Sequence, residues 1–260
     1  MVAEAVGCEV GRIGNRRDHF EGYGPPGTKK NELKPWRQKC WCIPPQANAE
    51  FVYAMEDVLR VYHREYDDDT VLVCLDETSR QQTRAARTSL PVRPGQPACY
   101  DYEYQRNGTA NLFMLSAPLQ GWRHVKVTDR RTKQDFAMVL KDLADGHFPG
   151  KTIVLVMDNL NTHKLATLYD TFEPAEANRL AQRFEVHHTP KHGSWLNMAE
   201  IEINVLTTQC FQRCIPDRAT MVREVRAWQD NRNGAAKPIE WRFRAEDARI
   251  KLKSLYPSIQ

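Results

Sequence analysis

Apolar residues form short continuous runs in some parts of the chain and helical stripes in others. Near-continuous apolar runs at residues 71–75 and 153–157 predict two buried strands, and residues 184–188 predict a shorter one. Apolar positions three and four residues apart predict helices at residues 47–62, 132–143, 165–172, 174–183, from Ser194 or Asn197 to about 210, 219–231 and 246–255.

Between the first two apolar runs, the pattern predicts antiparallel strands. Tyrosines alternate with acidic residues between positions 100 and 104, as in a half-buried strand, and Asn107 followed by glycine is a strong hairpin-turn signal. The chain would return over residues 110–117 and, after a turn at Gly121, form a third antiparallel strand over residues 124–128.

The order of these elements indicates the fold class. Antiparallel strands are followed by helices that alternate with single strands, which is typical of an α/β fold with a mixed sheet and helices on both faces. We predict four segments: an irregular basic leader at 1–35, a helical lead-in at 36–70, a core at 71–216 and a basic helical C-terminal extension at 217–260.

Composition and charge narrow the class of protein. Hydrophobic residues make up 41% and charged residues 27%, so a buried core is expected. The longest apolar runs have strand length and the start lacks a signal-peptide pattern, which predicts a cytoplasmic protein without a membrane partner. Seven cysteines lack disulfide-framework or zinc-finger spacing. The net charge of +4 is unevenly spread, with an acidic centre between basic ends. This suits a metal-dependent enzyme acting on a polyanion, and equally an ordinary solvated surface.

Two aspartates follow the two apolar runs directly. Asp76 comes after the first run and Asp158 after the second. Ligands gather at the carboxyl ends of strands in open α/β sheets, so these side chains would lie side by side, while Glu77 would point to the opposite face. Spacing alone equally allows both aspartates simply to end strands in turns.

A third carboxylate is expected from the helix that begins after residue 193. Its core stripe is expected at Met198, Ile201, Val205 and Thr208. Glu200 and Glu202 lie on opposite borders of this stripe, so only one can serve the site. Glu200 is favoured because Asn197 and Asn204 share its border. Three carboxylates can hold two hard divalent cations, the apparatus for cutting a phosphodiester bond.

Residues 75–79, 157–163 and 189–200 resemble motifs of DDE transposases, with the closest match in the mariner-like superfamily of bacterial insertion sequences. The resemblance extends over about residues 29–256. It implies a ribonuclease H-like core, magnesium-dependent cleavage and strand transfer of double-stranded DNA, and association with the nucleoid when bound to DNA. It also implies two Mg²⁺ ions per site, with Mn²⁺ as a substitute, and a homodimer when the protein is complete.

The resemblance also assigns roles to individual positions. Asp76, Asp158 and Glu200 match the catalytic, metal-binding triad of the family. Asn159 and His163 match positions close to that site.

The chain departs from the family pattern in two respects. Residues 159–199, 41 in number, separate the second and third carboxylates, more than the family usually has, and the extra length is expected around residues 173–179. Relatives carry helix-turn-helix domains before the core, whereas only the leader stands here, which predicts a catalytic half without its DNA-binding domains. Two alternatives are a non-catalytic DNA-binding remnant and a ribonuclease H-like nuclease that cuts without transposing.

Three basic residues are candidates for binding DNA. Lys191 and His192 lie in the loop before the Glu200 helix, and Arg80 belongs to an arginine-rich loop expected after Asp76. Each is predicted to approach the phosphate backbone. For each, an exposed, solvated charge is the alternative interpretation.

Overall fold

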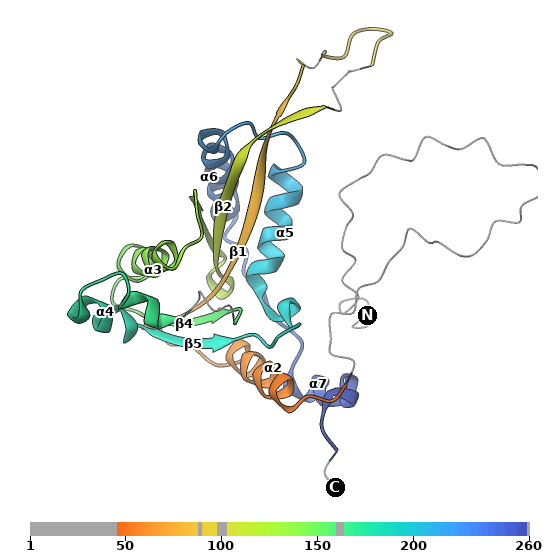
Figure 1. Ribbon diagram of the computed structural model, residues 1–260. Coiled ribbons are helices and arrows are strands. Elements are labelled where there is room, and N and C mark those ends of the chain that lie inside the picture. Colours follow the sequence, from red (N-terminus) through yellow and green to blue (C-terminus); the bar gives the residue numbers. More distant parts are fainter. Residues whose placement is uncertain (1–45, 88–89, 98–102, 160–163, 259–260) are drawn as a thin grey trace, which may run out of the picture.

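Five strands and six α-helices make up the part of the chain that the structure describes (Figure 1). The computed structural model describes residues 46–87, 90–97, 103–159 and 164–258. The strands are β1 (Thr70–Ala85), β2 (Tyr104–Ala117), β3 (Trp122–Thr128), β4 (Thr152–Met157) and β5 (Phe184–His188). The helices are α2 (Ala49–Tyr62), α3 (Lys133–Lys141), α4 (Pro174–Ala181), α5 (Met198–Cys210), α6 (Arg218–Ala235) and α7 (Ala245–Lys251).

The strands form one mixed sheet in the order β3-β2-β1-β4-β5. β1, β2 and β3 are antiparallel neighbours, β4 runs parallel to β1, and β5 runs parallel to β4. The predicted mixed sheet is confirmed. The antiparallel part lies on one side of β1 and the parallel part on the other, so β1 is the central strand.

Alternate residues of the strands bury two hydrophobic clusters, one on each face of the sheet. Leu72, Cys74 and Val156 belong to the first cluster, together with residues of α2, α5, α6 and α7. Val73 and Leu155 belong to the second, together with residues of α3 and α4. The prediction of helices on both faces is therefore confirmed.

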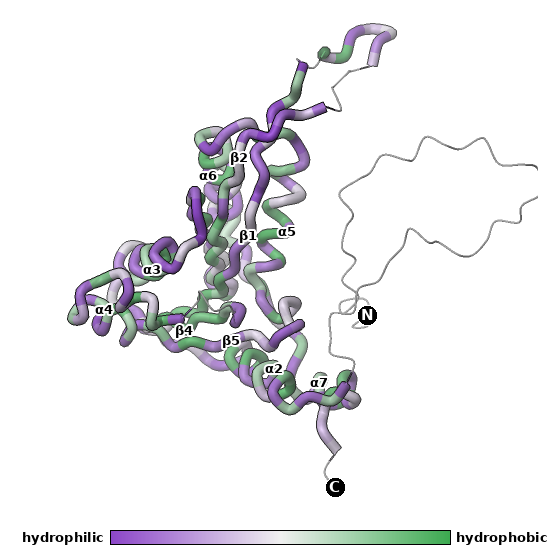
Figure 2. The backbone as a smooth tube through the Cα atoms, in the orientation of Figure 1, coloured by the Kyte–Doolittle hydropathy of each residue, from purple (hydrophilic) through white to green (hydrophobic). Residues whose placement is uncertain are grey.

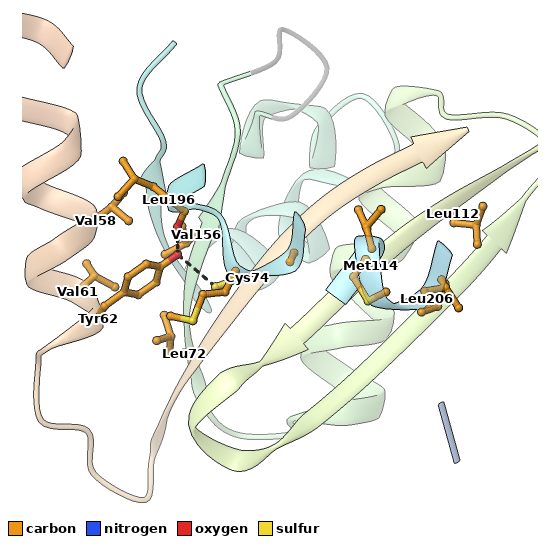
Figure 3. Close-up of a cluster of buried hydrophobic side chains, with 14 of the residues drawn as sticks. Val58, Val61, Tyr62, Leu72, Cys74, Leu112, Met114, Val156, Leu196 and Leu206 are labelled. Atoms are coloured by element: carbon orange, nitrogen blue, oxygen red, sulfur yellow. Dashed lines mark hydrogen bonds between the residues drawn. The ribbon is translucent and has the colours of Figure 1, made fainter. Parts of the chain in front are cut away.

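Tyr62 at the end of α2 joins three parts of the first cluster (Figure 3). Its hydroxyl donates to the main-chain oxygen of Leu196 at 2.5 Å and lies 3.6 Å from the sulfur of Cys74. Burial raises the pKa of the Cys74 thiol to about 12, so this cysteine stays protonated. The contact holds α2 and the segment before α5 against the central strand, two residues before Asp76.

β1 and β2 continue beyond the sheet as a two-stranded ribbon (Figure 1). The sequence predicted that the first strand stops at Leu75 and that an arginine-rich loop follows, but β1 continues to Ala85. Asn107 and Gly108 do not form the predicted hairpin turn: both lie within β2, where one extra residue bulges against β1. The strand pattern at residues 100–102 lies outside the described residues.

The outer half of this ribbon explains the error. Residues 103–109 are all exposed, and this part of β1 and β2 is mostly hydrophilic (Figure 2). The covered positions of this segment, Arg80 and Gln82, are polar as well, so there is no apolar alternation and periodicity does not reveal the strand. Gly108 has a φ of 100°, which suits glycine in a bulge as well as in a turn.

Six of the seven predicted helices are confirmed as α-helices, and the one predicted at residues 165–172 is not. α3 follows Thr132, which forms a capping box with Asp135, and it gives way at Lys141 to the π-helix η2 (Asp142–His147). The helix predicted at residues 165–172 is only the 3-10 turn η3 (Leu165–Leu168). For the helix with two possible starts, α5 begins after Asn197, and the 3-10 turn η4 (Ser194–Leu196) precedes it.

The buried side of α5 differs from the predicted stripe. Ile201 is 41% exposed and Thr208 is exposed, whereas the buried residues are Met198, Ala199, Glu202, Ile203 and Leu206. Glu202 occupies the core side because Arg123 and Arg232 neutralise it, with guanidinium nitrogens 2.9 Å from its Oε1. A hydrophobicity pattern places a glutamate outside, so it assigned the wrong side.

α6 pairs with the free edge of β3 through its side chains. The Val125 N–H donates to Gln229 Oε1 at 3.0 Å, and the Arg123 N–H donates to Asn233 Oδ1 at 2.8 Å. Asn233 Nδ2 donates back to the Arg123 carbonyl oxygen at 2.7 Å. Main-chain groups of an edge strand are thus satisfied by a helix instead of by another strand.

The predicted segments differ in how far the structure describes them. The leader at 1–35 lies outside the described residues. α2, from the lead-in, and α6 and α7, from the C-terminal extension, bury side chains in the same cluster as the central sheet. The segment boundaries themselves stay a prediction. Across the described ranges, no helix is long and apolar enough to cross a membrane.

Candidate active site

The pairing of β1 and β4 determines where Asp76 and Asp158 lie. The last paired residues are Cys74 and Val156, and each aspartate stands two positions further along its strand direction. Side chains two residues apart share a face, and neighbouring strands are about 4.8 Å apart. Both aspartates therefore extend from the face that α5 covers, at the carboxyl end of the parallel strand pair.

Glu77 points to the opposite face, as its position next to Asp76 predicts. Its Oε1 lies 3.0 Å from Nη1 of Arg131, and its side chain is only 6% exposed. Glu77 therefore belongs to the α3 side of the sheet and does not face the other carboxylates.

Asn197 fixes the start of α5, which carries Glu200 in its first turn. Asn197 Oδ1 accepts a hydrogen bond from the Ala199 N–H at 3.1 Å, and asparagine is among the best N-cap residues. Asn197 Nδ2 donates to the main-chain oxygen of Leu75 at 2.9 Å, directly before Asp76. Glu200 is partly exposed, whereas Glu202 is buried and bound by two arginines on the other side of the helix. Glu202 therefore does not share a side of α5 with Glu200.

Asp76 lies within electrostatic reach of Asp158, Glu200 and Glu77. The pKa of Asp76 is raised to about 7: burial is the largest cause, and the negative charges of Asp158 and Glu200 act in the same direction. A hydrogen bond of 2.8 Å from the Glu77 N–H to Asp76 Oδ1 opposes this shift. The structure thus brings the charges of the three predicted residues close enough to interact.

These side chains do not yet converge on one point. Among the residues that the structure describes, no three His, Cys, Asp or Glu side chains form a group ready to hold a metal ion. Metal binding at this position would require the carboxylates to turn toward a common centre.

Of the two other positions predicted near the site, Asn159 is exposed directly after Asp158, and His163 lies outside the described residues. Sequence reasoning missed His188, whose Nδ1 lies 3.2 Å from the main-chain oxygen of Asp158. The only available signal was its place at the end of the predicted strand at 184–188, next to the strand that leads to Asp158.

The loop before α5 has a fixed shape. Lys191 and His192 are both exposed, and His192 has a φ of 66°, in the left-handed region. A Cβ atom on Gly193 would lie 2.5 Å from Cγ of Pro190, so only glycine fits there. The basic loop therefore presents its two predicted DNA-binding residues to solvent.

Arg80 lies in β1 and packs against α5 instead of standing in a loop. Its Nη2 donates to Thr207 Oγ1, and its guanidinium carbon lies 5.6 Å from the centre of the Phe211 ring. Burial lowers the pKa of Arg80. Its Nε is buried and has no hydrogen-bond partner among the described residues.

Comparison with solved structures gives the fold. The Mos1 strand transfer complex matches with a TM-score of 0.50 and 15% identity, covering 70% of this chain and 53% of that chain. The Mos1 mariner paired end complex with Mn matches with a TM-score of 0.48 and 13% identity, covering 82% and 61%. The chain spans about half the length of the first of these. The predicted ribonuclease H-like fold is confirmed by the first match.

A family model described as DDE superfamily endonuclease matches residues 71–222, more than half of the 260 residues. The chain belongs to the DDE superfamily of endonucleases. The matched range includes β1, β4 and α5, the elements of this DDE domain that carry Asp76, Asp158 and Glu200. No curated protein matches the chain.

Proposed function

We propose that this DDE domain is the catalytic half of a transposase that cuts and joins double-stranded DNA. Asp76, Asp158 and Glu200 would act together at the carboxyl end of the β1–β4 pair. The observation that supports the proposal most is the β1–β4 register: Asp76 and Asp158 both come two residues after the paired Cys74 and Val156, and Asn197 bonds the first turn of α5, which bears Glu200, to Leu75. Carboxylates that repel one another in a partly buried site are suited to sharing cations.

The donor set fits hard divalent cations. Carboxylate oxygens are the ligands that Mg²⁺ prefers, and Mn²⁺ accepts the same ligands. Two such ions would lower the pKa of an attacking water or hydroxyl and stabilise the oxygen that leaves. Asp76 would lose its proton as cations bind, and Asp158 and Glu200 would hold the ions from the neighbouring strand and from the helix.

Three basic residues would hold the DNA strand. Lys191 and His192 are exposed on the fixed loop before α5, which suits contact with phosphate. Arg80 lies on the same side of β1 as Asp76, four residues further along, or about 13 Å in an extended strand. Its guanidinium packs against Thr207 and Phe211, so contact with phosphate would require the side chain to turn away from α5.

The chain spans about half the length of the first structural match. We propose that the complete protein pairs two DNA ends as a homodimer and acts in the bacterial cytoplasm, on nucleoid DNA. Asn159 and His163 would support the carboxylates, as their place after Asp158 suggests.

Nicking of supercoiled plasmid in Mn²⁺ tests the proposed site. The purified chain is compared with Asp158→Asn and with Glu77→Gln, a control that alters a carboxylate facing the other side of the sheet. Nicking by the wild type and Glu77→Gln that is lost in Asp158→Asn supports the proposal. Equal nicking by Asp158→Asn contradicts it, and no nicking by folded wild type favours a DNA-binding remnant.

A second assay separates a transposase from a nuclease that only cuts. An oligonucleotide with a free 3′-hydroxyl is incubated with plasmid, Mn²⁺ and the chain, and covalent joining of the labelled strand to plasmid is measured. Joined product that requires Asp158 supports strand transfer. Nicked plasmid without joined product would indicate a nuclease that cuts DNA but does not transfer strands.

A further inference from the structure

The side chain of Asn197 connects the two elements that carry Asp76 and Glu200. Its Nδ2 donates to the Leu75 carbonyl oxygen at 2.9 Å, and its Oδ1 accepts from the Ala199 N–H at 3.1 Å. The side chain is almost completely buried, with 1% of the residue exposed. One amide group therefore bonds to the main chain of β1 and to the main chain of α5.

Both bonds stand directly beside the carboxylates. Leu75 immediately precedes Asp76, and the Ala199 N–H belongs to the residue immediately before Glu200. One side chain thus connects the residue before Asp76 to the residue before Glu200.

The Leu75 carbonyl oxygen is available because the sheet opens at this point. β1 pairs with β4 only as far as Cys74, so the next residue of β1 has no strand on that side. The Asn197 amide fills the place where a further strand hydrogen bond would stand. The main-chain oxygen of Leu75 is thus hydrogen-bonded even though β4 has ended, just before Asp158.

Other contacts also hold the N-terminus of α5 near β1, but they reach β1 at other residues. Tyr62 anchors the preceding Leu196 to α2, and Arg80 reaches Thr207 near the other end of α5. The Met198 main chain also bonds to Cys74, two residues before Asp76, whereas the Asn197 amide bonds to Leu75, the residue next to Asp76.

We propose that Asn197 is a positioning residue that sets the separation of Asp76 and Glu200, and thereby the affinity of the site for divalent cations. The inference rests on the proposed function. Metal sites need ligands held to within about 0.5 Å by surrounding hydrogen bonds. Loss of the bond to Leu75 lets the first turn of α5 move away from β1, which separates the carboxylates without removing either.

The alternative is that Asn197 only caps the helix. Asn197→Ser separates the two roles, because serine caps helices about as well as asparagine but is too short to hold the Leu75 oxygen as well. Asn48→Ser is the matched control: Asn48 caps α2 by accepting from the Phe51 N–H at 2.9 Å, and α2 carries none of the three carboxylates.

The experiment measures Mn²⁺ binding to the full chain by calorimetry, with helix content followed by circular dichroism. We expect Asn197→Ser to remain folded and to bind Mn²⁺ about tenfold to a hundredfold more weakly, the usual effect of losing a residue that orients metal ligands. Asn48→Ser should bind Mn²⁺ as the wild type does. Wild-type affinity in folded Asn197→Ser overturns the inference.

Nicking assays at several Mn²⁺ concentrations give a second readout. The Asn197→Ser chain should need more Mn²⁺ for half-maximal nicking and should regain most of the wild-type rate at saturation. A lower rate at every Mn²⁺ concentration, with unchanged half-saturation, contradicts the positioning role. Asp158→Asn distinguishes the two proposals: if Asp158→Asn binds Mn²⁺ normally, the proposed site is wrong, whatever Asn197→Ser does.

Discussion

Asp76 should lower the free energy of unfolding of the metal-free protein at neutral pH and above, and Asp76→Asn should remove this destabilisation. The pKa of Asp76 is raised from 3.8 to about 7 in the folded state. Below about pH 4, the carboxyl is protonated in both the folded and the unfolded chain, so it affects stability little. Between pH 4 and 7, the unfolded chain ionises while the folded chain keeps the proton, so the free energy of unfolding falls as pH rises.

The size of this effect follows from the shift. A difference of about three pKa units corresponds to about 4 kcal/mol, which is an upper bound. Asp76 keeps some contact with solvent, and a discounted value of about 2 kcal/mol is our expectation for Asp76→Asn at pH 8. In a chain of this size, this corresponds to a rise of roughly 4–8 °C in melting temperature.

The assay is thermal and urea unfolding of wild type and Asp76→Asn in chelator at pH 5, 6.5 and 8. The stability difference should grow with pH, and Glu77→Gln should not reproduce it. Adding Mn²⁺ at pH 8 should stabilise the wild type more than Asp76→Asn, reversing the order. A difference that is absent at pH 8, or that does not change between pH 5 and 8, would refute the reasoning.

Three further substitutions, with Glu200→Gln as a control for the first, test other parts of the fold and site. Glu202→Gln leaves Arg123 buried without its counter-charge and should cost about 3–5 kcal/mol in urea unfolding, whereas Glu200→Gln should cost much less. Gly193→Ala places a methyl group against the proline three residues earlier and should lower both stability, by about 1–3 kcal/mol, and plasmid nicking. Tyr62→Phe removes the donor to the segment before α5 and should cost about 1–2 kcal/mol, measured by the shift of the urea midpoint at constant slope.

The sheet could be predicted from the sequence where strands are buried, and not where they are exposed. Residues 71–75 and 153–157 are apolar because both faces of those strands are covered, and the structure places them side by side. The outer half of the β1–β2 ribbon is polar even where Arg80 and Gln82 are covered, so its sequence resembled a loop. Asn107 followed by Gly108 is a common turn sequence, and it led to the prediction of a turn where the structure has a bulge.

The candidate site was predictable for the same reason that the buried strands were. Each of two buried apolar runs is followed by an aspartate. The alternation of side chains along a strand then predicts on which face, and at which end of the sheet, the two aspartates lie. Helical geometry required a choice between Glu200 and Glu202, because the two residues point apart on any α-helix, and Glu200 was chosen for its polar neighbours Asn197 and Asn204. The role of the three carboxylates remains a prediction. The contacts of Tyr62 and Asn197 join positions 134 and 122 apart in the sequence, and no local pattern reveals them.

The pairing of α6 with the edge of β3 has a consequence for how the chain can be shortened. Gln229 and Asn233 occupy donors and acceptors that a strand of another molecule would otherwise find. A fragment ending at residue 216 keeps all three carboxylates but presents that edge open, together with the apolar surface that Trp228 covers. Open edges of this kind recruit strands from neighbouring molecules. Insolubility of such a fragment would therefore reflect self-association through β3, and the C-terminal helix serves as a built-in barrier to that association.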